Sequence, residues 1–254
     1  MNRISAFSVR NIKELLRDPL SYIFCLGFPL VMLVVMTLVN DSIPPQANMT
    51  IFRIDNLCAG IAVFGLAFVM LFSCLSVTKD RSGAFLVRMY ATPMRSSDFI
   101  LGYMLPVLVL AVAQIIITFA ASFVVSLIVG IELSILGMLM AVVTLIPSAI
   151  LFIAFGLLFG TLFNEKAAPG VCSIIISLAS FLGGIFFDAE SAGGILFDIC
   201  KVLPFWHSTA AARCAVALNF EEYGVHMLVT AAYAVVLTVV SAVVFRTRMR
   251  ADLS

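Results

Sequence analysis

Long apolar runs alternate with short polar segments along the whole chain. Each run has about the length of a membrane-spanning helix, because roughly 20 helical residues cross the ~30 Å hydrocarbon layer of a bilayer. The runs cover residues 20–39, 57–77, 99–129, 134–163, 170–187 and 225–245. This pattern predicts an all-α integral membrane protein with six transmembrane helices in a single domain, residues 1–254.

Residues 1–19, which precede the first run, form an amphipathic segment. Apolar side chains recur on one helical face and basic side chains gather on the opposite one. The apolar face holds Ile4, Phe7, Ile12, Leu15 and Leu16, and the basic face holds Arg3, Arg10, Lys13 and Arg17. We therefore expect a helix lying in the membrane interface. Asp18-Pro19 ends it, and Pro29 is expected to bend the first span.

Residues 78–98, TKDRSGAFLVRMYATPMRSSD, form a short basic segment between the second and third spans. Four of the 15 Lys and Arg residues lie in it. Phe85 with Met89, and Leu86 with Tyr90, are i,i+4 pairs, which is helical spacing. The pattern predicts a short helix that stops before Pro93. The alternative is a plain loop whose basic residues only set the membrane topology.

Residues 188–224 are too few for two spans with turns and too apolar for a free loop. The segment predicts short re-entrant helices that dip into the outer leaflet, because non-spanning backbone is tolerated there when protein covers it. An amphipathic external lid is the alternative. In the fourth span, Pro147 is expected to interrupt the helix. Gly156 and Gly160 form a small-xxx-small pattern, for which ordinary core packing is the simpler interpretation.

Composition excludes a soluble protein. Hydrophobic residues make up 63% of the chain, charged residues 11%, and the mean hydropathy is +1.16. Soluble domains contain about 45–50% apolar and about 25% charged residues. The net charge of +1 and the lack of a dense basic cluster give no reason to expect a nucleic-acid partner. The lipid bilayer is the expected surrounding.

The distribution of Lys and Arg predicts the orientation. Twelve of the 15 lie on the side that holds both termini and residues 78–98, and the other side holds only Arg53, Lys201 and Arg213. Cytoplasmic segments carry the excess of basic residues. We therefore expect a multi-pass protein of the cell (plasma) membrane with both termini in the cytoplasm. The first apolar run is as long as a full span, so it does not indicate a cleavable signal peptide.

The sequence offers no catalytic or metal-binding motif. It lacks a P-loop, a HExxH and a GxSxG motif, and its six cysteines have no metal-ligand spacing. His207 and His226 lie at the predicted outer face, where interfacial histidines are common. Cys200 and Cys214 could form an external disulfide or serve as small apolar residues. The chain is therefore expected not to be an enzyme, and to bind no metal or cofactor itself.

All charged residues lie outside the six apolar runs. Ion-coupled transporters use ionisable groups or broken helices near the midplane, and channels use charged or carbonyl rings. A transporter without these features needs energy from another polypeptide. A secondary transporter or channel that works alone is the main alternative, and a non-transporting anchor or sensor is another.

Two spans carry side chains that could line a pathway. On the fifth span, Ser173, Ser177 and Gly184 lie on or near a small, weakly polar face. The candidates on the second span share one helical face, and the candidate set has three members on each span. They are Phe64, Phe68 and Phe72, and Ser173, Ser177 and Phe181. With 22 Phe and 12 Met in the chain, such a cavity suits a bulky apolar or amphipathic molecule. Ordinary packing of aromatic side chains is the alternative.

Three segments resemble a known family. They are Arg17-Asp18-Pro19 before the span with Pro29; Asp80-Arg81, Gly83, Leu86 and Thr92-Pro93; and Leu182-Gly183-Gly184-Ile185-Phe186-Phe187 with Leu203-Pro204 downstream. Together they are similar to the permease subunits of ATP-binding-cassette exporters of the type-two (G-like, drug-exporter) family. Members usually carry Pro after the Phe pair, where this chain has Asp188.

The resemblance implies a partner and a mechanism. In that family the loop after the second span is a coupling helix that docks on a nucleotide-binding ATPase subunit, which binds ATP and Mg. Two permease copies pair, as a homodimer or a heterodimer, and spans two and five line the pathway. The residues carried over as ATPase contacts are Asp80, Arg81, Gly83, Leu86, Arg88 and Thr92. The implied activity is export of a drug-like or lipid-like compound.

Overall fold

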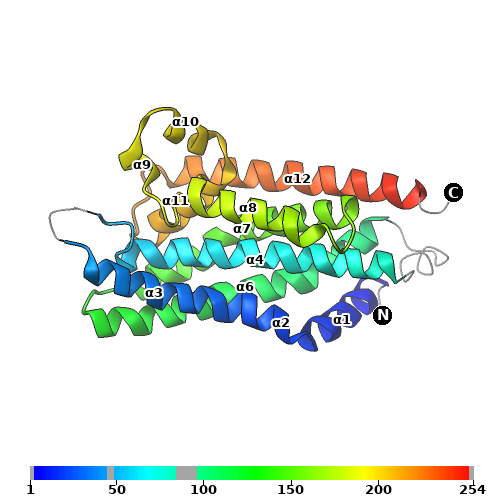
Figure 1. Cartoon of the computed structure of the whole chain (residues 1–254), viewed down its shortest axis with the longest axis horizontal. Coiled ribbons are helices and arrows are strands. Elements are labelled where there is room, and N and C mark those ends of the chain that lie inside the picture. The colour runs from blue at the N-terminus through cyan, green and yellow to red at the C-terminus, as the bar shows by residue number, and fades with distance from the viewer. Residues whose placement is uncertain (1–2, 45–48, 84–95, 252–254) are drawn as a thin grey trace.

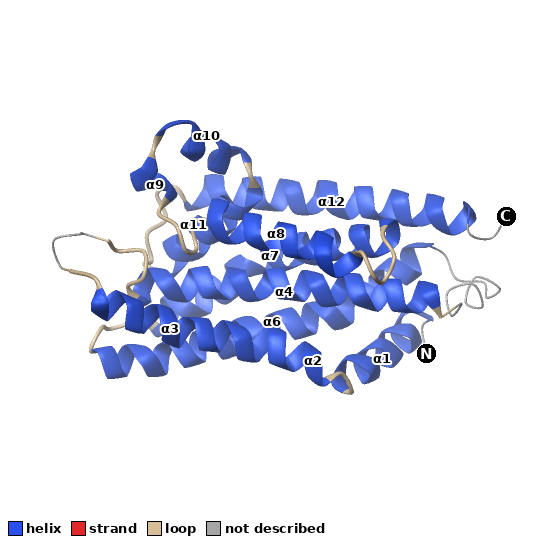
Figure 2. Ribbon diagram, in the orientation of Figure 1, coloured by secondary structure: helices blue, strands red, loops and turns tan. Residues whose placement is uncertain are grey.

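The computed structural model describes residues 3–44, 49–83 and 96–251, and within these ranges it is helical without a strand (Figure 2). The prediction of an all-α protein is therefore confirmed. The first half contains α1 (Arg3–Leu16), α2 (Pro19–Tyr22), the π-helix η1 (Ile23–Gly27), α3 (Phe28–Ser42), α4 (Ile54–Ser82) and α6 (Ser96–Val129). The second half contains α7 (Ile135–Leu162), α8 (Ala168–Leu182), α9 (Ala189–Ala192), α10 (Gly194–Val202), α11 (Pro204–Val216) and α12 (Tyr223–Ala251).

Among the described residues, five helices are long and apolar enough to cross a membrane. They are Ile23–Ser42, Ile54–Ser82, Ser97–Val129, Ile135–Leu162 and Tyr223–Arg248. The predicted span 170–187 corresponds to α8, which has 15 residues and is therefore only about 22 Å long. It ends because Gly183 caps the helix and Gly184 has a φ of +65°, a left-handed conformation that glycine adopts readily.

The helices α3, α6, α7 and α8 run alongside α4, and α12 packs against α7 (Figure 1). The most apolar part of α4 is 89% buried, compared with 17% for the span that contains α3 and 22% for α12. Figure 1 places α1 and the last turns of α12 at one end of the bundle, and α9 and α10 at the other. We call these the α1 end and the α9 end.

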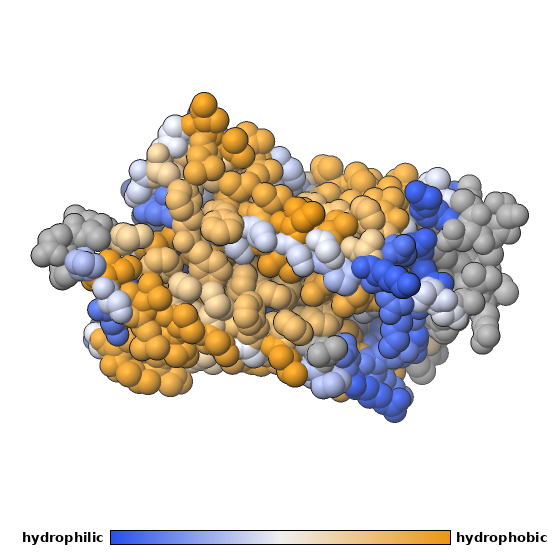
Figure 3. Space-filling model, in the orientation of Figure 1, coloured by the Kyte–Doolittle hydropathy of each residue, from blue (hydrophilic) through white to orange (hydrophobic). Residues whose placement is uncertain are grey.

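The surface of the bundle is apolar along its length. Figure 3 shows a broad hydrophobic belt on this face, with hydrophilic residues gathered at the α1 end. Large apolar side chains such as Ile128 and Leu228 are more than two-thirds exposed. A soluble monomer rarely exposes so large an apolar area, whereas a lipid-facing surface requires it.

Two prolines lie inside long helices without interrupting them. Pro147 lies inside α7 and Pro106 inside α6, and both helices continue past them. The expectation that Pro147 interrupts the fourth span is therefore wrong. Membrane helices tolerate proline because neighbouring groups satisfy the backbone that it frees. Pro29 follows the π-helical turn η1, where the hydrogen-bond register already departs from a regular α-helix.

Residues 188–224 divide into an exposed and a buried part. Ile195 and Val202 of α10 are exposed, whereas Phe205, Ser208 and Ala212 of α11 are buried. The helix α11 contacts α4, α7 and α12 inside the bundle. This stretch therefore contributes one helix to the protein interior at the α9 end.

The glycine pair of α7 allows unusually close contact with α4. A Cβ atom at Gly156 would lie 2.4 Å from the carbonyl oxygen of Met70, and one at Gly160 would lie 2.7 Å from that of Cys74. Both neighbours are backbone atoms, which cannot rotate away. The small-xxx-small pattern thus serves helix packing between α4 and α7.

Replacing Gly156 with alanine should lower the thermal stability of the protein. Alanine normally stabilises a helix relative to glycine, but the added methyl group would force α7 away from α4, at a cost of about 1–3 kcal/mol. Thermal unfolding of the purified protein measures this. Gly170→Ala in α8 is the matched control, because no atom lies within 4 Å of the added Cβ. Equal melting temperatures for the two variants would contradict the packing argument.

Candidate functional site

An ion pair between a half-buried arginine and a buried aspartate joins three helices at the α1 end. Arg10 of α1 donates from Nη1 to Oδ2 of Asp80 at 2.6 Å and from Nη2 to Oδ1 at 2.8 Å. Tyr103 of α6 donates its hydroxyl hydrogen to Oδ2 of the same carboxylate at 2.6 Å. Asp80, near the end of α4, is only 5% exposed. Its two oxygens therefore fasten α1 and α6 to α4 through charge-assisted hydrogen bonds.

Neighbouring contacts hold α1 in place. Asn11 donates from Nδ2 to the carbonyl oxygen of Gly102 at 3.0 Å, and the ring of Phe7 makes edge contacts with Phe99 and Tyr103. Burial alone would lower the pKa of Arg10, but the hydrogen bonds and charge of Asp80 outweigh burial and raise it. Arg10 is therefore a permanent cation at this junction.

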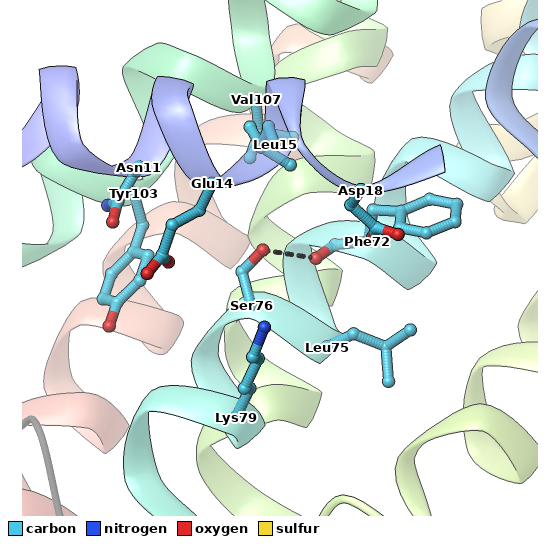
Figure 4. A pocket seen from close by; sticks show the side chains of 10 residues that line it. All are labelled: Asn11, Glu14, Leu15, Asp18, Phe72, Leu75, Ser76, Lys79, Tyr103 and Val107. Carbon is cyan, nitrogen blue, oxygen red and sulfur yellow. Dashed lines mark hydrogen bonds between the residues drawn. The ribbon is translucent and has the colours of Figure 1, made fainter. Parts of the chain in front are cut away.

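A small cavity lies between α1, α4 and α6. Figure 4 shows Glu14 of α1 and Lys79 of α4 at this cavity, together with Asp18, which lies between α1 and α2. Its volume is about 80 Å³, which holds only a few water molecules. It is too small to be part of a pathway for a bulky compound.

Arg81 connects the end of α4 to the end of α7. Its Nη1 donates to the carbonyl oxygens of Gly160, Thr161 and Phe163 at 3.1, 2.5 and 3.3 Å. The last carbonyls of a helix lack partners within it and carry partial negative charge, so a cation there is favourable. Ser82 adds a hydrogen bond from Oγ to Oε2 of Glu165 at 3.1 Å.

The six residues carried over as ATPase contacts divide into two groups. Asp80 and Arg81 bond within the chain, and Gly83 caps α4 through its N–H bond to the carbonyl of Lys79 at 3.0 Å. Leu86, Arg88 and Thr92 lie outside the described residues. Sequence reasoning missed Arg10 and Tyr103 as partners of Asp80, because no local pattern pairs residues that are 70 and 23 positions apart.

The phenylalanines proposed to line a pathway on the second span are buried. Phe64, Phe68 and Phe72 are 5%, 8% and 5% exposed. Phe24 and Phe28, which precede α3 and begin it, cover Phe64 and Phe68 with ring distances of 5.3–6.2 Å. In the single chain this face of α4 is therefore packed rather than open.

The candidates on the fifth span are exposed instead. Ser173 and Ser177 lie on the outer face of α8, and each donates its hydroxyl hydrogen to a carbonyl one turn earlier, at 2.8 and 2.9 Å. Phe181 is 60% exposed. The structure thus separates the two predicted sets into one buried and one exposed group.

The α9 end holds an arginine that the sequence analysis treated only as an external charge. Arg213 of α11 donates from Nη2 to the carbonyl oxygen of Gly184 at 2.7 Å and from Nε to that of Asn56 at 3.3 Å. It therefore joins α11 to the turn after α8 and to the start of α4. A single arginine in the otherwise uncharged stretch 204–216 is the sequence signal for such a role.

Cysteines and histidines at this end form no metal site within the described ranges. All six cysteines are free thiols, including Cys200 and Cys214. His207 and His226 share a hydrogen bond of 2.9 Å between their Nδ1 atoms, and Nε2 of His207 donates to the carbonyl of Lys201 at 2.8 Å. The two histidines therefore pair with each other, which no spacing in the sequence indicated.

The chain was compared with known protein families and proteins. The family model described as ABC-2 type transporter matches residues 2–216 of the chain. No curated protein matches the chain. The matched region begins with the amphipathic α1 and includes the Asp80 junction, α8 and α11.

Proposed function

The chain belongs to the ABC-2 type transporter family, and we propose that it is the permease of an ATP-driven exporter for an apolar or amphipathic compound. The family match supports a membrane subunit of an ABC transporter. In the proposal, a separate nucleotide-binding subunit binds ATP and Mg and hydrolyses ATP. Two permease copies form the pathway, as a homodimer or with a sister permease.

The proposed topology has six crossings with both termini in the cytoplasm. α7 runs toward the α1 end and α12 starts at the α9 end (Figure 1), so the chain must return along the bundle between them. α8 lies on this return path. Together with residues 183–187 it would supply the one crossing that the five long helices do not provide, which is the fifth in chain order. The excess of Lys and Arg at the α1 end supports a cytoplasmic location for it. The segment from α9 to α11 would then be the external re-entrant part.

The Asp80–Arg81 junction is proposed to pass motion from the ATPase into the membrane. A coupling helix within residues 84–95 would touch the ATPase, because α4 ends directly before these residues and α6 begins directly after them. Asp80 connects this point to α1 and α6, and Arg81 connects it to α7. Charged hydrogen bonds between helix ends are stiff links, so a displacement of the loop would reach four helices.

The pathway is proposed to form between two copies. Ser173, Ser177 and Phe181 are exposed on α8 of the single chain, so a second copy could face them across a shared cavity. Phe64, Phe68 and Phe72 would contribute to it only after α3 moves, because Phe24 and Phe28 cover two of them. The compound itself stays open between a drug-like and a lipid-like molecule.

Acidic substitutions in residues 84–95 should weaken assembly with the ATPase. Arg88→Asp and Leu86→Asp are each expected to reduce co-purification with the proposed nucleotide-binding subunit by about tenfold, because a buried like charge or an unpaired carboxylate costs a few kcal/mol at an interface. Arg246→Asp is the matched control, since it removes the same charge from the same predicted side and Arg246 is exposed. Unchanged co-purification of both loop variants would reject the docking role.

Reconstitution separates this proposal from a transporter that works alone. Vesicles that contain only the purified chain should show no flux of hydrophobic dyes when an ion gradient is imposed across the membrane. Flux under these conditions, without ATPase or nucleotide, would favour a secondary transporter or channel instead.

A further inference from the structure

A polar cavity of about 250 Å³ lies at the α9 end, where α4 begins and α8 has just ended. Its walls carry charges of both signs: Arg213 from α11, and Asp188 and Glu190 from the start of α9. Drug-sized ligands occupy pockets of about 300–1,000 Å³, so this cavity suits a smaller group. Its position at the ends of the apolar helices is the level of lipid headgroups.

Opposite charges share this cavity without touching. Among the described residues, no carboxylate oxygen lies within 4.0 Å of a guanidinium nitrogen of Arg213, whose hydrogen-bond acceptors are two backbone carbonyls. Its Nη1 lines the cavity wall near Gly184 and donates to no acceptor in the described part of the chain. A partly buried guanidinium has five N–H donors to satisfy, so its remaining donors are available to a ligand.

The two sides of the cavity remain ionised at neutral pH. Burial lowers the pKa of Arg213 more than the charges of Glu190 and Asp188 raise it, but an arginine stays protonated far above pH 7. Burial would raise the pKa of Asp188, yet hydrogen bonds from Ser191 and the charge of Arg213 outweigh burial and lower it. The cavity therefore presents a cation and a carboxylate pair on separate walls.

A simple ion does not match this arrangement. An anion beside Arg213 would also face Asp188 and Glu190, and a cation beside those carboxylates would face Arg213. A molecule with both charges satisfies both walls, because each charge gains a partner of the opposite sign. The indole of Trp206 also lines the cavity, and aromatic faces attract ammonium groups.

We propose that this cavity binds a zwitterion that carries a phosphate and an ammonium group. The phosphate pairs with Arg213 and the ammonium lies toward Asp188 and Glu190. The same chemistry occurs in the headgroup of phosphatidylethanolamine and in free phosphoethanolamine. This site does not depend on the proposed export function.

Titration of the purified full-length chain tests the charge pattern. O-phosphoethanolamine should bind at least about tenfold more tightly than inorganic phosphate or ethanolamine, since a second charge pair contributes about 1.4 kcal/mol or more. Glu190→Gln should reduce this preference to about threefold or less, by weakening the zwitterion and strengthening phosphate. Glu190 is exposed and makes no side-chain hydrogen bond in the described part of the chain, so this variant should fold. Arg213→Gln should abolish binding of both O-phosphoethanolamine and inorganic phosphate.

A control variant and a second experiment complete the test, and the second experiment distinguishes a lipid headgroup from a free zwitterion. Glu221→Gln removes an exposed carboxylate outside the cavity and should leave every affinity unchanged. In nanodiscs, phosphatidylethanolamine should raise the melting temperature above that in phosphatidylglycerol, and Glu190→Gln should remove the difference. Binding of the lipid but not of the free compound identifies a lipid headgroup site, and binding of both includes the free zwitterion. Measurable but equal affinities for phosphate and phosphoethanolamine would overturn the proposal, and so would the absence of any effect of Glu190→Gln in both the titration and the nanodiscs.

Discussion

Replacing Arg10 with methionine should destabilise the protein by about 3 kcal/mol, since it leaves a buried carboxylate without its cation. The side chain of Asp80 is only 6% exposed, so water cannot replace the guanidinium. Methionine keeps an apolar stem and removes the charge together with the N–H donors that bond Asp80. Thermal unfolding of the purified chain measures the loss of stability, and ATP hydrolysis by the assembled complex measures the loss of coupling between α1 and α4.

Two further variants separate this ion pair from the general effect of losing a charge. Lys13→Met removes a cation from the exposed face of the same helix and should change stability by less than about 0.5 kcal/mol. Arg10→Met combined with Asp80→Asn removes the stranded carboxylate and should recover at least half of the loss, because the two sites interact directly. The ion-pair argument fails if Arg10→Met is no more destabilising than Lys13→Met.

The spans could be predicted from sequence because hydropathy is a local property. The apolar runs gave the long helices, and the observed ends differ mainly where polar residues extend a helix beyond the hydrocarbon. α4, for example, continues to Ser82 instead of stopping at Val77. It does so because Thr78, Asp80 and Arg81 find hydrogen-bond partners there. The shortness of α8 was missed because Gly183 and Gly184 sit inside an apolar run that hides the break.

The position of the candidate site could be predicted from the sequence, but the hydrogen-bond partners of its side chains could not. The sequence placed Asp80 and Arg81 at the start of a basic segment, which is where the structure has them. It could not show that both side chains turn back into the protein, because Arg10 and the end of α7 are about 70–80 residues away in the chain. Such pairs depend on tertiary packing, which no helical period encodes.

The α9 end illustrates the same limit. Lysines and arginines were counted there only to set orientation, and the separation of Arg213 from Asp188 and Glu190 by a cavity has no signature in the sequence. Asp188 did stand out, because it replaces the proline that the resembled family usually has. The structure gives that departure a physical use: its carboxylate caps α9 through Ser191 and lines the cavity.

Replacing Arg81 with methionine should uncouple ATP hydrolysis from the membrane helices while leaving the complex assembled. Nη1 faces the carbonyls at the end of α7, so its loss should loosen the link between the ends of α4 and α7 without removing the predicted docking residues 86, 88 and 92. A coupling free energy of about 1.4 kcal/mol corresponds to a tenfold change. We therefore expect permease-dependent ATP hydrolysis to fall about tenfold, with co-purification of the nucleotide-binding subunit unchanged.

Matched substitutions decide whether Arg81 acts inside the permease or on the ATPase. Lys79→Met removes an exposed cation two residues earlier in α4 and should leave both measurements unchanged. Arg81→Lys should restore only part of the hydrolysis, since the lysine side chain is one atom shorter and its ammonium would not reach the position of Nη1 beside all three carbonyls. Loss of co-purification in Arg81→Met would show instead that Arg81 contacts the ATPase directly, as the family resemblance alone would suggest, and would refute the internal link to α7 as its main role.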